Sequence, residues 1–425
     1  MPAVNADLHI HSLHSIGVSK LMTVPQLAVG AKQKGLHLIG TGDATQPDWL
    51  NHLRTTLVNK NGLLSYNSVH FVPTVEIEDG ESIHHIALLP TLESVKTLRR
   101  DLKAFSPNLD HEWGGRPRVN TQAEILAGIV RDNGGMIGPA HAFTPFRAIF
   151  REGKYSSLKE CYGSEISHIH FIELGLSADS EIADYIPELR PLTYITSSDA
   201  HSPYPDKLGR EFVTLEMESP SFEELRLAIL REKGRKPLLN VGFDPRLGKY
   251  FLSFCSSCRR TLVVRDGEAA PDFDDLNIYI SVKDLEERQR LLQAIHRRKV
   301  FCPADGKKLR LGVRDRAMMI GEGRSKSPSH RPPYLHVPPL LDLLATALGI
   351  KSKSSKRLNE LYSVLRSRFG PEATILSDTP IAEIAKIDRT LSQMLSVYRK
   401  GNVEYIPGGG GRYGTIATHW EVDEA

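Results

Sequence analysis

The sequence VNADLHIHS, residues 4–12, decides the fold class. It is a short apolar run that ends in two histidines, His9 and His11, separated by one residue. Side chains alternate between the two faces of a strand, so these imidazoles point to the same side. A second pair with the same spacing, Asp199 and His201, follows another apolar run at residues 194–197. Two such pairs, each at the end of an expected strand, indicate one polar site shared by distant segments.

Short apolar runs alternate with helix-like segments as far as about residue 218. Residues 23–34 have the start and stop signals of a helix: Thr23 lies at the N-cap position, Pro25 in the first turn, and Gly35 follows the last turn. This alternation predicts a parallel α/β layout. We expect about seven strands in about 230 residues, which is enough to close a barrel.

Imidazoles and carboxylates recur at the ends of the expected strands. Barrel enzymes gather functional residues at the C-terminal ends of parallel strands, and both side-chain types bind zinc, manganese and iron. A lone histidine beside a strand is more often structural, but the repeated spacing favours a metal site. The expected ligands are His9, His11, Asp43, Glu76, His85, His141, Asp199 and His201.

Several positions of this site carry more detailed expectations. Either His84 or His85 can be the ligand, because neighbours on a strand face opposite ways, and His85 is preferred because it leads directly into an apolar run. Glu76 and Asp199 are expected to be catalytic and to bridge metals, since a carboxylate has two oxygens. Glu173 either supports the site or is an ordinary strand residue.

The second half of the chain contains a possible zinc element. Cys255 and Cys258 form a Cys-x-x-Cys knuckle, and Cys302 and Asp305 form a second one about 43 residues later. Structural zinc sites pair two such knuckles. A carboxylate in the fourth position is compatible with zinc, and also with a knuckle that has lost its metal.

Basic and glycine-rich segments near the C-terminus suggest contact with a polyanion. A basic run follows an apolar stretch at residues 340–348, and four consecutive glycines precede an arginine and a tyrosine. Glycine lets a backbone approach a ligand closely, arginine neutralises phosphate and tyrosine stacks on bases. A solvated helix face and a flexible tail are the alternatives. The expected DNA-binding residues are Lys351, Lys353, Lys356, Arg357, Gly409, Gly410, Arg412 and Tyr413.

Composition places the chain among ordinary globular proteins. It has 425 residues, 40% hydrophobic and 25% charged, with a net charge of +3 and most of the basic excess after residue 290. No apolar run is long enough to span a membrane, and no export signal is visible, so we expect a cytoplasmic protein without a membrane partner. We expect domains at residues 1–240, 241–320 and 321–425, the last beginning with a polar linker at 321–333.

The polar segments resemble the PHP (polymerase and histidinol phosphatase) superfamily. The matching segments are residues 7–12, 41–43, 74–76, 139–141 and 198–201, although Asp43 is followed by Ala44 where many members have histidine. The resemblance implies a distorted seven-stranded β/α barrel with a centre of two or three metals, namely zinc, manganese or magnesium. The eight residues above are its ligands by that resemblance.

The whole chain resembles the endonuclease Q family of DNA-repair nucleases. The matching segments are residues 255–258, 311–316, 330–334 and 405–414. This resemblance implies a PHP barrel, a small zinc-knuckle element at residues 241–320 and a helical, DNA-binding C-terminal domain. It also implies hydrolysis of the phosphodiester 5′ to uracil, hypoxanthine, xanthine or an abasic site, in double- or single-stranded DNA.

Two other functions remain open at this level. A small-molecule phosphatase needs no basic C-terminal half, and a non-catalytic nucleic-acid scaffold needs no intact ligand set. A base pocket is not identifiable, although Trp49, Trp113, Phe143, Phe146 and Tyr162 are aromatic candidates. Residues 418–425 show no sliding-clamp-binding pattern.

Overall fold

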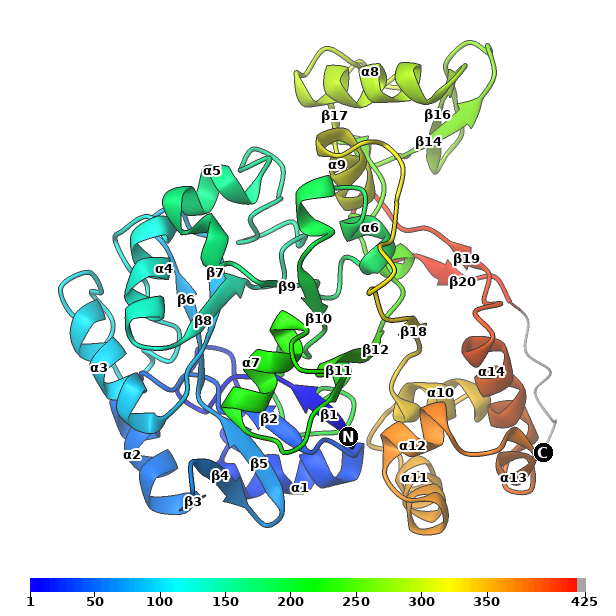
Figure 1. Cartoon of the computed structure of the whole chain (residues 1–425). Helices are drawn as coiled ribbons and strands as arrows, with labels where there is room; N and C mark the ends of the chain where they lie inside the picture. The colour runs from blue at the N-terminus through cyan, green and yellow to red at the C-terminus, as the bar shows by residue number, and fades with distance from the viewer. Residues whose placement is uncertain (419–425) are drawn as a thin grey trace.

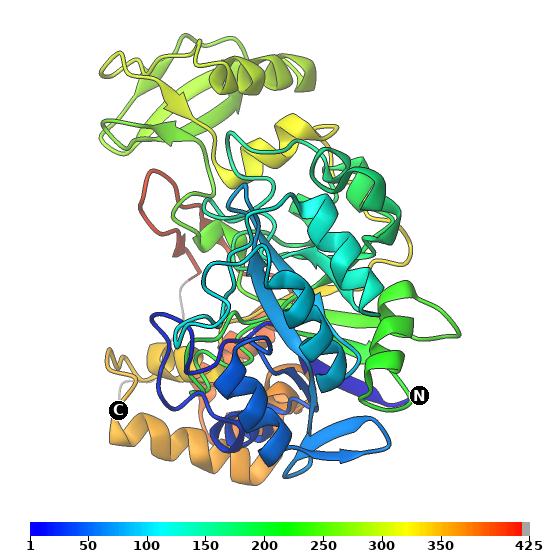
Figure 2. The same ribbon diagram turned by 90° about the vertical axis from the view of Figure 1, so that its left-hand side faces the viewer.

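The computed structural model describes residues 1–418 and contains three regions (Figure 1). A large α/β region begins at the N-terminus, a small region with β14, β16 and α8 projects from it, and helices α10 to α14 pack beside it. Figure 2 shows the small region and the C-terminal helices at opposite ends of the molecule. None of the helices described is long and apolar enough to cross a membrane.

The first region holds twelve strands and the short helices between them. Its strands are β1 (Ala3–Asp7), β2 (Leu38–Gly40), β3 (Val58–Lys60), β4 (Leu63–Tyr66), β5 (Val69–Val72), β6 (Thr74–Glu78), β7 (His84–Leu88), β8 (Met136–Pro139), β9 (Phe171–Glu173), β10 (Thr193–Ile195), β11 (Phe212–Glu216) and β12 (Lys236–Gly242). Its helices are α1 (Val24–Lys34), α2 (Pro47–Thr56), α3 (Leu92–Leu102), α4 (Ala123–Asp132), α5 (Leu158–Tyr162), η1 (Gly163–His168), α6 (Ser180–Ala183), η2 (Pro187–Leu189) and α7 (Phe222–Leu230).

The two remaining regions are smaller. The small projecting region contains η3 (Pro245–Leu247), β13 (Phe254–Cys255), β14 (Thr261–Asp266), β15 (Asp272–Phe273), β16 (Asn277–Val282), α8 (Leu285–His296), β17 (Leu309–Arg310) and α9 (Val313–Ile320). The C-terminal region contains β18 (Tyr334–His336), α10 (Leu340–Ala347), α11 (Lys356–Phe369), α12 (Glu372–Ser377), α13 (Ile381–Ala385), α14 (Arg389–Arg399), β19 (Tyr405–Ile406) and β20 (Thr415–Ile416).

The α/β class is confirmed, but the prediction of a parallel layout is wrong for several strands. β1, β2 and β5 run parallel, as do β9 and β10. In contrast, β11 lies antiparallel to β1, and β6, β7 and β8 form an antiparallel sheet. The link between β6 and β7 is too short for a helical crossover, so this pair is a hairpin. The result is a mixed α/β fold.

Apolar side chains from the separate sheets meet in one cluster. Leu8, Leu38, Ile86, Phe171 and Val213 are buried together, although they come from or directly follow β1, β2, β7, β9 and β11. Packing them against one another brings the ends of these strands close together. The polar residues at the strand ends are therefore gathered into one place.

The C-terminal region is fastened to the first region in two ways. β18 joins the N-terminal sheet as a parallel neighbour of β12, so the predicted domain boundary near residue 321 does not separate two independent sheets. The buried Lys34 on α1 pairs with the buried Glu372 on α12 at 2.5 Å. Glu372 also accepts hydrogen bonds from the Leu340 amide and the Tyr362 hydroxyl, so no charge is left unpaired at this contact.

Candidate metal centre and its surroundings

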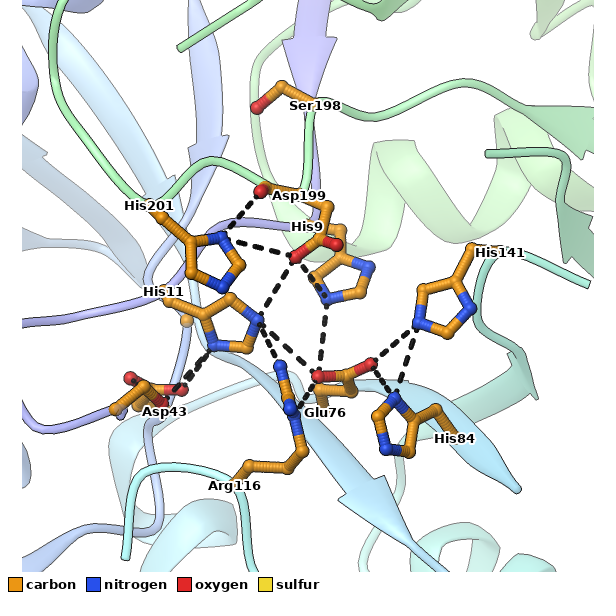
Figure 3. A network of polar contacts seen from close by, with 12 residues as sticks. His9, His11, Asp43, Glu76, His84, Arg116, His141, Ser198, Asp199 and His201 are labelled. Atoms are coloured by element: carbon orange, nitrogen blue, oxygen red, sulfur yellow. Dashed lines mark hydrogen bonds and ion pairs between the residues drawn. The ribbon is translucent and has the colours of Figure 1, made fainter. Parts of the chain in front are cut away.

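Six side chains converge at the ends of the N-terminal strands as two groups (Figure 3). The first group is His9, His11 and Asp199, and the second is Glu76, His84 and His141. Within each group the possible ligand atoms all lie within 4.8 Å of one another. Imidazole and carboxylate atoms at such separations can share one metal ion.

Glu76 faces both groups. Its Oε1 lies 2.6 Å from Nδ1 of His84 and 2.9 Å from Nε2 of His141. Its Oε2 lies 3.8 Å from Nε2 of His9 and 3.4 Å from Nε2 of His11. A carboxylate in this position can ligate two metals at once, as we expected for Glu76.

Two atoms of the first group fit a metal because neither makes a hydrogen bond, although Oδ1 of Asp199 also lies 3.1 Å from Nε2 of His11. Nε2 of His9 and Oδ1 of Asp199 are buried and make no hydrogen bond, although they lie only 3.8 Å apart. Buried polar atoms are rarely left without a partner. A divalent cation between them satisfies both atoms, so this ligand set fits the metal that the PHP resemblance implies.

The electrostatics of the cluster favour a cation. Burial lowers the pKa of His9, but the carboxylates of Glu173 and Glu76 outweigh burial and raise it well above its usual value. Burial raises the pKa of Glu76, but the charges of His84 and Arg116 outweigh burial and hold it well below its usual range. Glu76 therefore remains a carboxylate, which is the form that binds a metal.

The expected ligand Asp43 has a different place in the structure. Its Oδ1 accepts a hydrogen bond from Nδ1 of His11 at 2.9 Å, and its Oδ2 accepts three from the Ser12 amide and the Ser12 and Ser15 hydroxyls. Both oxygens are thus used on the far side of His11. The structure therefore does not place Asp43 in either group of converging atoms, and its position is that of a carboxylate that orients a ligating imidazole.

Glu173 supports His9 and His141 as Asp43 supports His11, through hydrogen bonds. Its Oε2 accepts from Nδ1 of His9 at 2.8 Å and from the His141 amide at 3.0 Å. Of the two readings left open for Glu173, the structure selects the one in which it supports the site. Hydrogen bonds of this kind fix the tautomer and the orientation of a ligating histidine.

Of the two adjacent histidines on β7, His84 is the one that lies in the cluster. His84 points into the cluster, whereas His85 points to the other face of the strand and contacts Asp79 at 3.1 Å and the Tyr162 hydroxyl at 2.7 Å. The preference for His85 is therefore wrong. The apolar run after His85 reflects its burial in the core and not a position in the site.

Three residues of the site have unusual backbone conformations. Asp43, His141 and Asp199 follow β2, β8 and β10, and all have positive φ angles of 48°, 31° and 47°. Non-glycine residues in this region carry strain that a surrounding structure must hold in place. At Asp199 this support comes from Asp7, whose carboxylate accepts hydrogen bonds from the Ser198 amide and hydroxyl.

His201 lies at the opening of the cluster. Its Nδ1 donates to the Asp199 carbonyl at 2.8 Å, and its side chain is 39% exposed. Its ring packs edge-on against His11 with centroids 4.8 Å apart. His201 is thus close to the first group, but the structure does not place it within either set of converging atoms.

Arg116 is a residue of the cluster that the sequence did not indicate. Its Nε contacts Glu76, and an Nη lies 3.1 Å from Nε2 of His11 (Figure 3). It comes from the long connection between α3 and α4 and not from a strand end, so it lies outside the pattern of polar residues that follow apolar runs. Its guanidinium lies where a substrate anion would approach the cluster.

An open pocket of about 250 Å³ exposes the cluster to solvent. It is lined by His84, His141, Asp199, His201, Arg116, Arg147 and Phe146, among others. Phe146 also lines a neighbouring pocket of about 220 Å³ between the first region and the small region. Of the aromatic candidates, Phe143 and Phe146 line this second pocket, while Trp49 and Tyr162 are fully buried in the core.

The predicted zinc residues converge in the small region. Cys255, Cys258, Cys302 and Asp305 bring their ligand atoms within 4.8 Å of one another. The Cys258 and Cys302 sulfurs are 3.8 Å apart, and the Cys255 sulfur lies 3.4 Å from Asp305. This arrangement fits the expected Cys3Asp set, so bound zinc remains a prediction with suitable geometry.

The predicted DNA-binding residues do not form one surface. Lys353 pairs with Asp342 at 2.5 Å and with Asp206 at 3.4 Å. Lys351, Lys356 and Arg357 are exposed, and Lys356 lies 3.8 Å from Glu360 on the same helix. Lys353 therefore makes local ion pairs, and DNA contacts at all four positions stay a prediction.

The glycine-rich turn packs against the protein itself. A Cβ at Gly409 would lie 2.6 Å from Thr261, and one at Gly410 would collide with the Arg259 carbonyl. Arg412 donates to the Leu276 carbonyl and to Thr261. The close backbone approach that we expected toward DNA is made toward the small region, because the turn docks on β14. Tyr413 remains 70% exposed, beside Lys249. The clamp-binding prediction for residues 418–425 falls almost wholly outside the residues described.

Comparison with known proteins gives three informative matches. A lesion-specific endonuclease Q from Pyrococcus furiosus is 39% identical, with a TM-score of 0.86 over 100% of this chain and 97% of that chain. An endonuclease Q solved with a 27-mer duplex that carries an abasic lesion at the active site is 38% identical, with a TM-score of 0.83 over 100% and 98%. The Methanocaldococcus jannaschii protein MJ0043 is 32% identical over 65% of this chain, and the match spans only 31% of that protein.

The C-terminal helices match a known family model as well. Residues 339–402 match the model described as the MJ0043 C-terminal domain. The fold and the clustered ligands together define a metal-dependent hydrolase. The identity and coverage of the solved structures go further, and the chain belongs to the endonuclease Q family.

Proposed function

We propose that this protein is a metal-dependent DNA repair endonuclease that cleaves the phosphodiester 5′ to a deaminated base or an abasic site. The observation that carries the proposal is a pair of buried ligand atoms without a hydrogen bond, Nε2 of His9 and Oδ1 of Asp199, which lie near Glu76 beside a pocket open to solvent. The family relationship supplies the substrate class, since one relative is solved with lesion-containing duplex DNA.

We assign one metal to His9, His11 and Asp199, and a second to Glu76, His84 and His141, with Glu76 shared. Zinc, manganese and magnesium all fit the proposal, and Cys255, Cys258, Cys302 and Asp305 would hold a structural zinc. Divalent metals in a paired site supply a nucleophilic water at neutral pH and neutralise charge on phosphate oxygens. We also propose that the N-terminal sheets form the distorted seven-stranded PHP barrel.

The protein groups around the cluster have separate tasks in this proposal. Asp43 and Glu173 hold the imidazoles of His11 and His9 in orientation through hydrogen bonds of 2.9 and 2.8 Å. Arg116 lies against the ligands and offers guanidinium donors to a phosphate oxygen. A guanidinium binds phosphate through paired, charge-assisted hydrogen bonds, so it can fix the scissile group for in-line attack.

The neighbouring aromatic pocket is the place that we propose for the extruded base. It shares Phe146 with the metal pocket and is also lined by Tyr250, Phe254 and Arg316. Enzymes that act on a damaged base take it out of the stack and hold it between apolar and aromatic side chains. The shared wall lets one nucleotide place its base in one pocket and its phosphate in the other.

Arg316 gives this pocket a chemical preference. It is only 3% exposed, and although one Nη donates to the Lys154 and Tyr155 carbonyls, its Nε and other Nη have no hydrogen-bond partner. Deamination replaces an exocyclic amino group with a carbonyl oxygen. A buried N–H group donates a hydrogen bond to a carbonyl oxygen and finds no acceptor in an amino group, which would let one site recognise uracil, hypoxanthine and xanthine.

A nicking assay tests the proposed function. We expect cuts immediately 5′ to uracil, hypoxanthine, xanthine and abasic sites in labelled duplexes, and none in the matched undamaged duplex. Hydrolysis of a small phosphomonoester should be absent. Rapid phosphomonoester hydrolysis without any nicking would instead make the protein a small-molecule phosphatase.

The role of Arg316 is tested by Arg316→Met, which keeps the length of the side chain and removes its donors. We expect uracil nicking to fall about 10- to 100-fold, the usual loss when a buried hydrogen bond to substrate is removed. Abasic nicking should change little, because that lesion has no base to recognise. An equal loss on both lesions would show that Arg316 supports the fold and does not select the base.

A further inference from the structure

A large apolar side chain stands exposed beside the metal pocket. Ile16 is 82% exposed, in the connection between β1 and α1. The residues before it are held firmly, since the Ser12 and Ser15 hydroxyls donate to Asp43 at 2.7 and 2.9 Å. Gly17, which follows, has a φ of 80°. An exposed side chain on an anchored turn keeps a fixed position relative to the catalytic centre.

Ile16 does not stand alone. Ile16 lines a third pocket, of about 220 Å³, which is separate from the metal pocket and from the aromatic pocket. Trp113, which is 47% exposed in the connection between α3 and α4, lines this third pocket as well. Two contacts tie the two connections together: Nδ1 of His14 lies 3.2 Å from the Glu112 carbonyl, and the Gly115 amide donates to the His14 carbonyl at 3.2 Å. Single exposed apolar residues are common on proteins. Two of them on loops that are hydrogen-bonded to each other beside the metal site form one apolar patch that needs an explanation.

The surroundings of the pair are cationic. Arg116 and Arg118 line its pocket, and the acidic residue there, Glu78, is already paired with Arg147 at 2.9 Å and His84 at 3.3 Å. Arg116 also lines the metal pocket, so the two spaces are neighbours. An apolar tip beside two guanidinium groups, of which Arg116 also contacts Glu76, fits a polyanion with an apolar interior. This describes a DNA duplex better than the apolar face of a protein partner.

We propose that Ile16, supported by Trp113, is a wedge that enters the duplex where the damaged nucleotide leaves it. This inference rests on the proposed function. Extruding a nucleotide breaks stacking on both sides, at a cost of a few kcal/mol. An apolar side chain that fills the gap left by the extruded nucleotide restores part of the lost stacking with the neighbouring bases and keeps the gap open. Arg116 and Arg118 lie where they neutralise the phosphates on either side.

The test compares two substrates that differ only in stacking. The first is a uracil-containing duplex. The second carries the same uracil strand, annealed to two short complements that leave the uracil and its neighbours unpaired. For Ile16→Ala we expect single-turnover nicking of the duplex to fall about tenfold, since part of the unstacking cost returns, and nicking of the gapped substrate to stay at the wild-type rate. Ile16→Leu should retain both activities.

Leu21→Ala is the matched control, because Leu21 is 43% exposed in the same connection and does not line the pocket. It should leave both rates unchanged, and melting temperatures should match for all variants. Equal losses of Ile16→Ala on the two substrates, or no loss on either, would overturn the wedge. If the wild type nicks neither substrate, the proposed function itself fails, which separates the two outcomes.

Discussion

Replacing Asp199 by asparagine should abolish strand cleavage while DNA binding persists. Asp199 supplies a buried, unpartnered oxygen to the first metal group. Asparagine keeps the shape and removes the charge that a cation requires. The metal contributes several kcal/mol to transition-state stabilisation, so we expect nicking to fall by about 1,000-fold or more.

Gel-shift measurements on the uncleaved duplex provide the second readout. Binding rests on phosphate contacts away from Asp199, so the dissociation constant should remain that of the wild type. Asp132→Asn is a suitable control, because Asp132 is 69% exposed and far from the cluster along α4. Nicking at near the wild-type rate by Asp199→Asn would remove this residue from the active site.

The second large effect is expected for Glu76→Gln, in the metal content. Glu76 belongs to the second group, and its Oε2 also faces His9 and His11 of the first group. Glutamine removes the negative charge and leaves Arg116 without its partner beside the remaining ligands, so the positive field opposes a metal. Loss of an orienting group alone costs about 10- to 100-fold in metal affinity, and loss of this shared ligand should cost at least as much.

Elemental analysis of the purified variant measures that effect. We expect fewer metal ions per chain than in the wild type, with a similar circular dichroism spectrum. Glu93→Gln, on the exposed face of α3, should keep the wild-type metal content. A Glu76→Gln protein with unchanged metal content and activity would show that the two groups do not share this carboxylate.

The sequence predicted the residues that follow a simple rule and missed those that do not. His9, His11, Glu76, His141 and Asp199 lie on a strand or just after one, where the alternation of side chains is readable, and the structure brings all five together. His84 and His85 lie on β7, which forms a hairpin with β6. Which of the two side chains points into the site depends on this antiparallel pairing, and the sequence had predicted a parallel sheet.

The other differences have related physical causes. Residue type alone does not distinguish a metal ligand from a carboxylate that orients one, which is the position that Asp43 has in the structure. Arg116 lies in an irregular connection, where position in space depends on tertiary contacts and not on periodicity. The glycine-rich turn was correctly read as a site of close backbone approach, but the sequence could not show that its partner is β14 of the same chain.

The central claim is that the paired groups around Glu76 hold the metals that cleave lesion DNA. The most direct measurement is nicking of an abasic-site duplex by chelator-treated protein, as a function of the metal ions restored per chain. We expect no cleavage by the stripped protein, full recovery as the cluster fills, and no recovery in Asp199→Asn at any metal content. Cleavage by stripped protein, with the wild-type rate and no measurable metal, would contradict the account.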